Sequence, residues 1–95
     1  MVVIELCYQK PLDQVEVFLE AHRHFLNTYY EQGVFLASGP KNPRDGGMII
    51  ALCSKDQAQE MIAQDPFYKE GIAAYKVIEF NPVRAHENLK TILEV

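Results

Sequence analysis

Four segments of the chain carry hydrophobic side chains in the pattern of β-strands. Residues 34–38 and 73–80 are short runs rich in hydrophobic residues, and residues 48–53 are hydrophobic at every position. Residues 2–8 alternate, so that every second side chain falls on one face: Val2, Ile4, Leu6 and Tyr8. We therefore expect four strands, of which the third is apolar on both faces.

A helical pattern fills the segment between the first two strands. Asp13 and Glu16 have the spacing of a capping box, and Gly33 suits the position just after a helix end. We expect the helix to begin at Asp13 and to stop at Gly33. Its hydrophobic side chains recur three and four residues apart, as in one buried stripe: Val15, Phe18, Leu19, Phe25, Leu26 and Tyr29.

A second helical segment follows the third strand. Ser54 and Gln57 form another capping box, and the helix that they open would bury Ala58, Met61 and Ile62. The pair Asp65-Pro66 interrupts this helix, because the residue before a proline avoids helical geometry. Pro66 then suits the first position of a short turn that ends at Gly71.

The order of these elements is βαββαβ, which is the plan of the α+β ferredoxin-like fold with a four-stranded antiparallel sheet. Residues 39–47 contain two prolines and the sequence Asp-Gly-Gly, which favour a hairpin-like loop rather than a helical crossover. Residues 1–82 would form this domain. Residues 83–95 have hydrophobic residues at loose helical spacing, and we expect an arm at an oligomer interface, with a frayed terminus as the alternative.

His22 interrupts the hydrophobic stripe of the first helix. It lies three to four residues from hydrophobic residues on either side, so the helix turns it inward, whereas His24 falls on the polar face. A buried imidazole needs a polar partner, and Asp65 is the best candidate along the chain. Each residue also has a purely structural interpretation. His22 could be satisfied by a backbone carbonyl, and Asp65 could cap the turn that begins at Pro66.

Three further residues are candidates for contacts with a ligand. Ser38 borders a Gly-Pro turn, where its hydroxyl could bind a ligand oxygen or its own backbone. No nucleophile-elbow pattern surrounds Ser38, so the sequence does not support covalent hydrolase chemistry. Arg44 could attract an anion or could be a hydrophilic loop tip. Phe67 belongs to a set of aromatic residues that could line a pocket or fill the core: Tyr29, Tyr30, Phe67, Tyr68 and Tyr75.

Composition and charge exclude several classes of partner. The chain has 95 residues, a net charge of −4 and only nine scattered Lys and Arg, which argues against nucleic acid or an anionic membrane as the main partner. The longest apolar run, residues 48–53, is far below the roughly 20 residues of a membrane helix. The first residues lack the pattern of a signal peptide, so we expect a cytoplasmic protein in which Cys7 and Cys53 are buried thiols, with a disulfide as the alternative.

The same search yields no cofactor or metal motif. Three histidines and two cysteines at unrelated spacings give no metal site, and no glycine-rich phosphate loop or dinucleotide fingerprint occurs. We therefore expect no cofactor and no metal.

The hydrophobic pattern also indicates self-association. Two helices can cover only one face of a four-stranded sheet, yet residues 48–53 are apolar on both faces. A second sheet from a second subunit is the simplest cover, which would produce a barrel-like homodimer.

An ordered set of short motifs resembles the YciI-like family over roughly residues 1–82. The set is His22-x-x-Phe25-Leu26, Gly33, Ser38-Gly39-Pro40, Asp45-Gly46-Gly47, Asp65-Pro66-Phe67 and Gly71. The resemblance implies a ferredoxin-like fold that dimerises sheet to sheet as a dimeric α/β barrel, sometimes in larger rings. It also implies a small-molecule pocket with a His and an Asp proposed as a catalytic pair, which here are His22 and Asp65.

Relatives of this family include muconolactone isomerases and a dehydrochlorinase that acts on a chlorinated lactone. The resemblance therefore suggests cofactor-independent proton abstraction next to the carbonyl of a small acid or lactone. In this hypothesis His22 moves the proton and Asp65 orients and supports the ring. Two alternatives stay open: a small-molecule binding or accessory module without turnover, and a cofactor-free monooxygenase of the same barrel type.

Overall fold

The computed structural model describes residues 1–95 and contains the predicted order of elements. A short 3₁₀ helix, η1 (Glu87–Leu89), and a final turn, α4 (Lys90–Leu93), follow that order. The elements of the main domain are β1 (Val2–Tyr8), α1 (Leu12–Glu31), β2 (Phe35–Pro40), β3 (Gly46–Ala51), α2 (Lys55–Ile62), α3 (Pro66–Lys69) and β4 (Ala73–Glu79).

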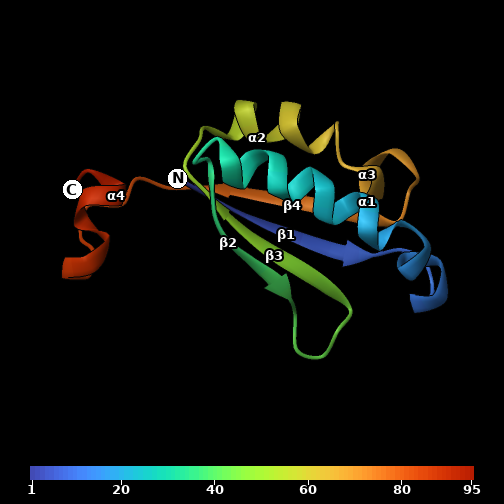
Figure 1. Ribbon diagram of the computed structural model, residues 1–95. Coiled ribbons are helices and arrows are strands. Elements are labelled where there is room, and N and C mark those ends of the chain that lie inside the picture. The colour runs from blue at the N-terminus through green and yellow to red at the C-terminus, as the bar shows by residue number, and fades with distance from the viewer.

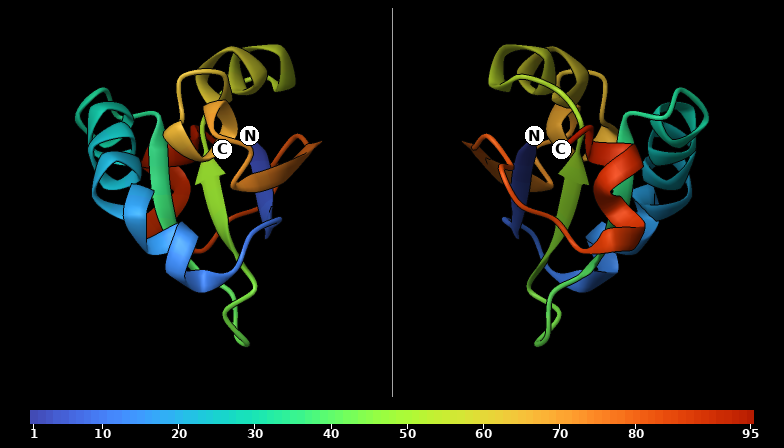
Figure 2. Two further views of the ribbon diagram at one scale, coloured as in Figure 1. Left: turned by 90° about the vertical axis from the view of Figure 1, so that its right-hand side faces the viewer. Right: turned by 90° about the vertical axis from the view of Figure 1, so that its left-hand side faces the viewer.

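The four strands form one sheet in the order β2-β3-β1-β4, and every neighbouring pair is antiparallel. Helices α1, α2 and α3 lie on one face of this sheet (Figures 1 and 2). This arrangement confirms the predicted α+β fold of the ferredoxin-like type. No helix combines the length and the apolar composition that crossing a bilayer requires.

The hydrophobic core lies between the sheet and the helices. Strand alternation directs Val2, Ile4 and Leu6 of β1 to the helix side, where all three are buried. Ile49 and Ala51 of β3 join them on the same face, as their register with β1 requires. Helix α1 contributes Val15, Phe25 and the side chain of His22.

The predicted capping box of α1 is wrong. The helix begins at Leu12 after Pro11, whose extended backbone is the cap, and no side chain caps the helix. The Asp13 carboxylate instead accepts a hydrogen bond from the amide of its neighbour Gln14, and Glu16 pairs with Arg44. The predicted end is confirmed, since Gly33 adopts a φ of 74°, a left-handed conformation that favours glycine.

The two other predicted caps are present. The Ser54 side chain accepts from the Gln57 amide while the Gln57 side chain accepts from the Ser54 amide, which closes the capping box of α2. The Asp65 carboxylate accepts from the Phe67 amide at 3.0 Å and caps α3. Both helix starts are therefore fixed by local sequence, as predicted.

The hairpin between β2 and β3 is tighter than predicted. Strand β2 ends at Pro40 rather than at residue 38, and β3 runs from Gly46 to Ala51 rather than from residue 48 to residue 53. Strand β3 begins earlier because Gly46 already pairs with Cys7 of β1, and glycine is required there since a Cβ atom would overlap the Leu6 carbonyl oxygen. Strand β4 also ends one residue before the predicted position, at Glu79.

The face of the sheet opposite the helices is open and carries both apolar and charged side chains, since Glu5 and Lys76 pair two positions from Val3 and Ile78. One row of side chains crosses all four strands, because Val3 pairs with both Ile50 and Ile78, and Ile50 pairs with Ala37. Ile78 is 50% exposed. The segment after β4 extends beyond the sheet in Figure 1, and Val83 is 82% exposed. Its predicted role as an interface arm stays a prediction.

Candidate active site

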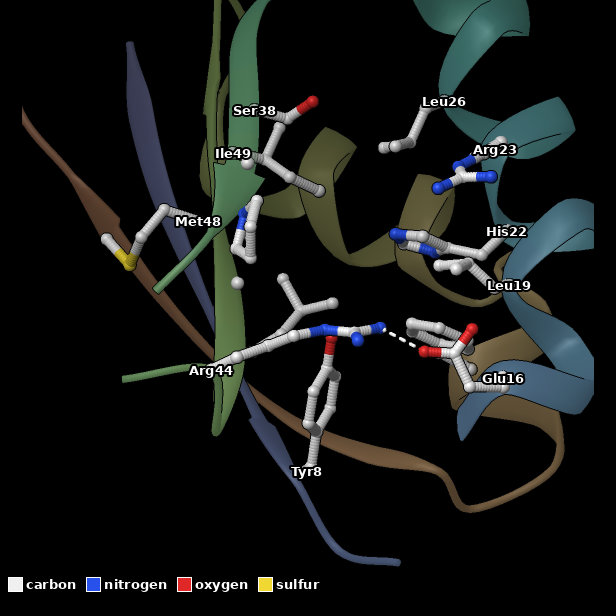
Figure 3. A pocket seen from close by; sticks show the side chains of 15 residues that line it. Tyr8, Glu16, Leu19, His22, Arg23, Leu26, Ser38, Arg44, Met48 and Ile49 are labelled. Atoms are coloured by element: carbon white, nitrogen blue, oxygen red, sulfur yellow. Dashed lines mark ion pairs between the residues drawn. The ribbon is translucent and has the colours of Figure 1, made fainter. Parts of the chain in front are cut away.

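A cavity of about 520 Å³ opens between α1 and the β2–β3 side of the sheet (Figure 3). Its volume is in the range of sites for small molecules. Helix α1 supplies one wall, strands β1, β2 and β3 supply the other, and Phe67 of α3 is part of the lining. Side chains from separate parts of the sequence converge here. The polar ones include Tyr8, Glu16, His22, Arg23, Ser38 and Arg44. The hydrophobic ones include Leu19, Leu26 and Ile49.

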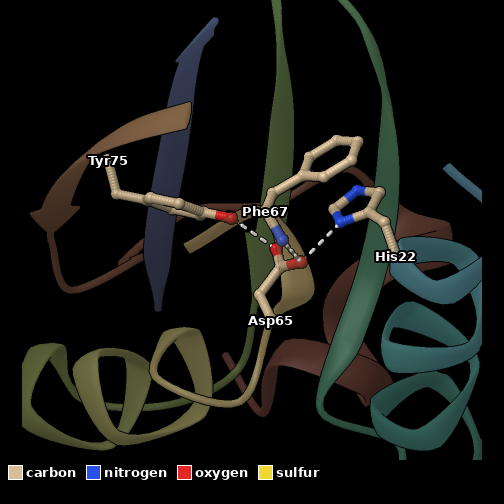
Figure 4. Close-up of polar contacts among 4 residues, drawn as sticks. All are labelled: His22, Asp65, Phe67 and Tyr75. Carbon is tan, nitrogen blue, oxygen red and sulfur yellow. Dashed lines mark hydrogen bonds and ion pairs between the residues drawn. The ribbon is translucent and has the colours of Figure 1, made fainter. Parts of the chain in front are cut away.

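His22 and Asp65 are in direct contact at this cavity. The Nδ1 atom of His22 lies 2.8 Å from Oδ1 of Asp65 (Figure 4), although the two residues are 43 positions apart in the chain. His22 is 9% exposed and Asp65 is fully buried. The expected partner of the inward-facing histidine is thus the one found, and the backbone-carbonyl alternative does not hold.

The Asp65 carboxylate accepts hydrogen bonds from three donors. Oδ1 accepts hydrogen bonds from Nδ1 of His22 and from the backbone amide of Phe67, and Oδ2 accepts one from the hydroxyl of Tyr75 (Figure 4). Three donors compensate the loss of water around a buried carboxylate and fix its orientation. Asp65 is therefore both the cap of α3 and the partner of His22, so its two predicted roles coexist in one side chain.

The contact with Asp65 determines how a neutral His22 ring presents itself to the cavity. An ionised carboxylate only accepts, so Nδ1 must carry the hydrogen that is donated. The Nε2 atom has no hydrogen-bond partner in the chain. Every fully buried side-chain nitrogen or oxygen has such a partner, so Nε2 is not fully buried. Nε2 is therefore accessible, and because His22 lines the cavity, its lone pair is available to a molecule bound there.

The ring of Phe67 packs against one face of the His22 imidazole and fixes its orientation. The two rings are stacked with centroids 4.0 Å apart and an interplanar angle of 3°. Phe67 is 1% exposed, so it is a fixed surface against which the His22 ring rests. The predicted role of Phe67 as a ligand contact stays a prediction, whereas its contact with His22 is direct.

Ser38 and Arg44 both line the cavity, and each already has a partner. The Ser38 hydroxyl lies 2.6 Å from the hydroxyl of Tyr30. Arg44 forms an ion pair with Glu16 at 2.8 Å (Figure 3). Hydrogen bonds with Glu16 and then with Tyr8 raise the pKa of Arg44 above its ordinary value. Their roles in binding a ligand stay predictions.

Tyr75 is the part of the site that was not predicted from the sequence, where it appears only as one aromatic residue among several. Its place on the helix side could have been inferred, since it stands opposite Leu6 in the register of β1 and β4. Burial, followed by the charge of Asp65 and the hydrogen bond to it, raises the pKa of Tyr75 well above its ordinary range. Tyr75 therefore keeps its proton and remains a donor to Asp65 at physiological pH.

Replacing Tyr75 with phenylalanine should lower the free energy of unfolding by about 1.5–3 kcal/mol, because a buried carboxylate loses a donor while the ring is kept. The raised pKa means that folding favours the protonated phenol. Its contribution is complete below the ordinary value of 10.0 and is lost as the pH rises above it. Urea unfolding of both proteins from about pH 7 to pH 11 measures this difference.

The exposed Tyr68 provides the matched control, since Tyr68→Phe removes a hydroxyl without a hydrogen-bond partner. A difference between wild type and Tyr75→Phe that stays constant across the alkaline range would contradict the prediction.

The four-stranded antiparallel sheet with helices on one face, together with a buried His–Asp pair beside a cavity, makes this protein an α+β protein of the ferredoxin-like type with a candidate site between α1 and the sheet. The chain belongs to the family of the YCII-related domain, whose family model matches residues 1–81. This finding confirms the resemblance inferred from the sequence. No curated protein matches the chain.

A solved structure with the same fold is 5-chloro-2-hydroxyhydroquinone dehydrochlorinase (TftG) from Burkholderia phenoliruptrix AC1100, in complex with 2,5-dihydroxybenzoquinone. The TM-score is 0.69 at 20% sequence identity, and the match covers 84% of this chain and 93% of TftG. At that identity the similarity establishes the fold. No group of three or more His, Cys, Asp or Glu side chains is arranged to hold a metal ion.

Proposed function

We propose that the protein is a cofactor-independent acid–base enzyme that moves a proton next to the carbonyl of a small acid or lactone. The observation that carries this proposal is the His22 imidazole, which is bound through Nδ1 to a fully buried carboxylate and leaves Nε2 accessible at the cavity. That is the arrangement of a general base with its orienting partner.

The proton transfer follows from this geometry. Nε2 takes a proton from the carbon beside the carbonyl, and the imidazolium that forms is stabilised by the negative charge of Asp65 at 2.8 Å. Return of the proton to a different carbon gives isomerisation, and departure of an anionic leaving group gives elimination. The ligand named with TftG, 2,5-dihydroxybenzoquinone, is likewise a small ring with carbonyl groups, which supports a substrate of this size.

Solvent deuterium exchange tests the proposal directly. Small lactones and keto acids are incubated with the protein in D₂O, and the loss of the proton signal beside the carbonyl is followed by NMR. We expect enzyme-dependent exchange for at least one compound. A compound that binds but neither exchanges nor changes would indicate the binding module, and consumption of oxygen would indicate the monooxygenase.

We also propose that the protein is a homodimer formed through the open face of its sheet. The apolar row of Ala37, Ile50, Val3 and Ile78 crosses this face, and no helix of the chain covers it. A second copy of the same sheet would bury this row, and burial of apolar surface is the main favourable term in such an association. Larger rings of dimers would require further contacts outside this face.

Replacing Ile78 with aspartate should convert the dimer to a monomer, because the substitution places a charge in the apolar row that the second sheet would bury. Light scattering at micromolar concentration measures the mass. Val17→Asp is the matched control, since Val17 is 74% exposed on α1, away from the open face. A wild-type protein with the mass of one chain would contradict the proposal, as would an Ile78→Asp variant that stays dimeric.

A further inference from the structure

The cavity has a different charge from the molecule as a whole. The chain carries a net charge of −4, with 13 acidic residues against nine Lys and Arg. Among the side chains that line the cavity, however, the fixed charges are two guanidiniums, Arg23 and Arg44, and one carboxylate, Glu16. The side chains in direct contact with the cavity therefore have an excess of one positive charge, while the carboxylate of Asp65 lies buried behind the His22 ring.

One of the two guanidiniums is already neutralised. Arg44 extends from the loop between β2 and β3 across to α1, where it meets Glu16 at 2.8 Å. The hydroxyl of Tyr8 points toward the same guanidinium (Figure 3). A ligand would have to displace Glu16 before it could form a strong ion pair with Arg44.

Arg23 is the guanidinium without a partner. It forms no ion pair and no hydrogen bond with the chain, and its head group is directed into the cavity beside the His22 ring (Figure 3). Neighbours on a helix point in different directions, but the long Arg23 side chain brings its guanidinium beside the His22 ring at the cavity, so an anion bound there would lie close to that ring (Figure 3). The wall around them is apolar and includes Leu19, Leu26 and Ile49.

We propose that Arg23 binds a carboxylate of the ligand, so that the cavity selects small cyclic molecules with one negative charge over neutral ones of the same shape. A guanidinium binds a carboxylate through two parallel hydrogen bonds, which fixes the orientation of the ligand as well as its position. The apolar wall then contacts the ring, and the reacting carbon faces His22. This inference rests on the proposed function only for the place of the reacting carbon.

Benzoate and benzamide are suitable probes, because they share one shape and differ by one charge. Each is titrated into ¹⁵N-labelled protein at low salt, and binding is read from the backbone amides of Ser38, Gly39 and Gly47, which line the cavity. We expect benzoate to bind more tightly than benzamide. Added salt should weaken the binding of benzoate only.

Three variants locate the charge that is responsible. Arg23→Gln should weaken benzoate binding roughly tenfold and leave benzamide unchanged, since the ion pair with a charged group is lost. Glu16→Gln should act in the opposite direction and tighten benzoate binding about threefold, because it frees Arg44. Arg84→Gln makes the same change outside the cavity and should have no effect.

The outcomes separate this inference from the proposed function. Equal binding of the two probes, unchanged benzoate binding in Arg23→Gln, or no benzoate-dependent shift at the three cavity amides would each overturn the role of Arg23. His22→Gln should still bind benzoate, because the binding experiment involves no proton transfer. Full turnover by His22→Gln would therefore remove the proposed function without affecting the result for Arg23.

Discussion

Replacing His22 with glutamine should abolish proton transfer in a protein that still folds. We expect the rate of exchange or turnover to fall roughly 10²–10⁴-fold, which is the range for loss of a general base. Glutamine retains a polar side chain of similar size that can still donate to Asp65, so the buried carboxylate is not left without this donor. Its amide has no lone pair basic enough to take a proton from carbon. Rate is measured by deuterium exchange, and folding by thermal denaturation.

His24→Gln is the matched control, since His24 lies two positions further along α1 with its side chain exposed. It should change neither the rate nor the melting temperature. If His22 is only a support in the core, His22→Gln and His22→Ala will lower the melting temperature without a selective loss of rate. In that case the Ala variant will be the less stable of the two, because it leaves a cavity and an unpaired carboxylate.

The fold could be predicted because hydrophobic side chains recur along the sequence with the period of a strand or of a helix. The alternation of Val2, Ile4 and Leu6 and the helical stripe that contains Phe25 each specify one buried face, and packing preserved both. The inward direction of His22 follows from the same stripe. Because a buried imidazole requires a partner, periodicity and the rule about polar burial predicted a polar neighbour for His22. The preference for Asp65 over a backbone carbonyl also depended on the resemblance to the YciI-like family, and the structure shows that contact.

Side-chain contacts in which a distant residue replaces a local partner could not be predicted from the sequence. Asp13 and Glu16 have the spacing of a capping box, but Glu16 pairs with Arg44, which comes from a loop far along the chain. Tyr75 joins the site because antiparallel pairing with β1 brings it to Asp65; alternation along β4 can indicate which face it is on, but not this partner. Interactions between distant segments thus decided the details that local patterns left open.

Replacing Asp65 with asparagine should impair both stability and catalysis. Three donors converge on this carboxylate, from His22, Phe67 and Tyr75, and the neutral amide turns each charge-assisted hydrogen bond into a weaker one. One amide edge is itself a donor and cannot accept the bond that an Asp65 oxygen accepts now. We expect the free energy of unfolding to fall by about 2–4 kcal/mol, measured by urea denaturation at neutral pH.

The rate should fall by more than this loss of stability explains. The imidazolium that forms during proton transfer would have no negative charge beside Nδ1, so we expect a decrease of roughly 10²–10⁴-fold in the fraction that remains folded. Asp56→Asn, an exposed change in the first turn of α2, is the matched control and should affect neither quantity strongly. An Asp65→Asn variant that loses stability but keeps its rate per folded molecule would show that Asp65 is a cap of α3 and has no part in catalysis.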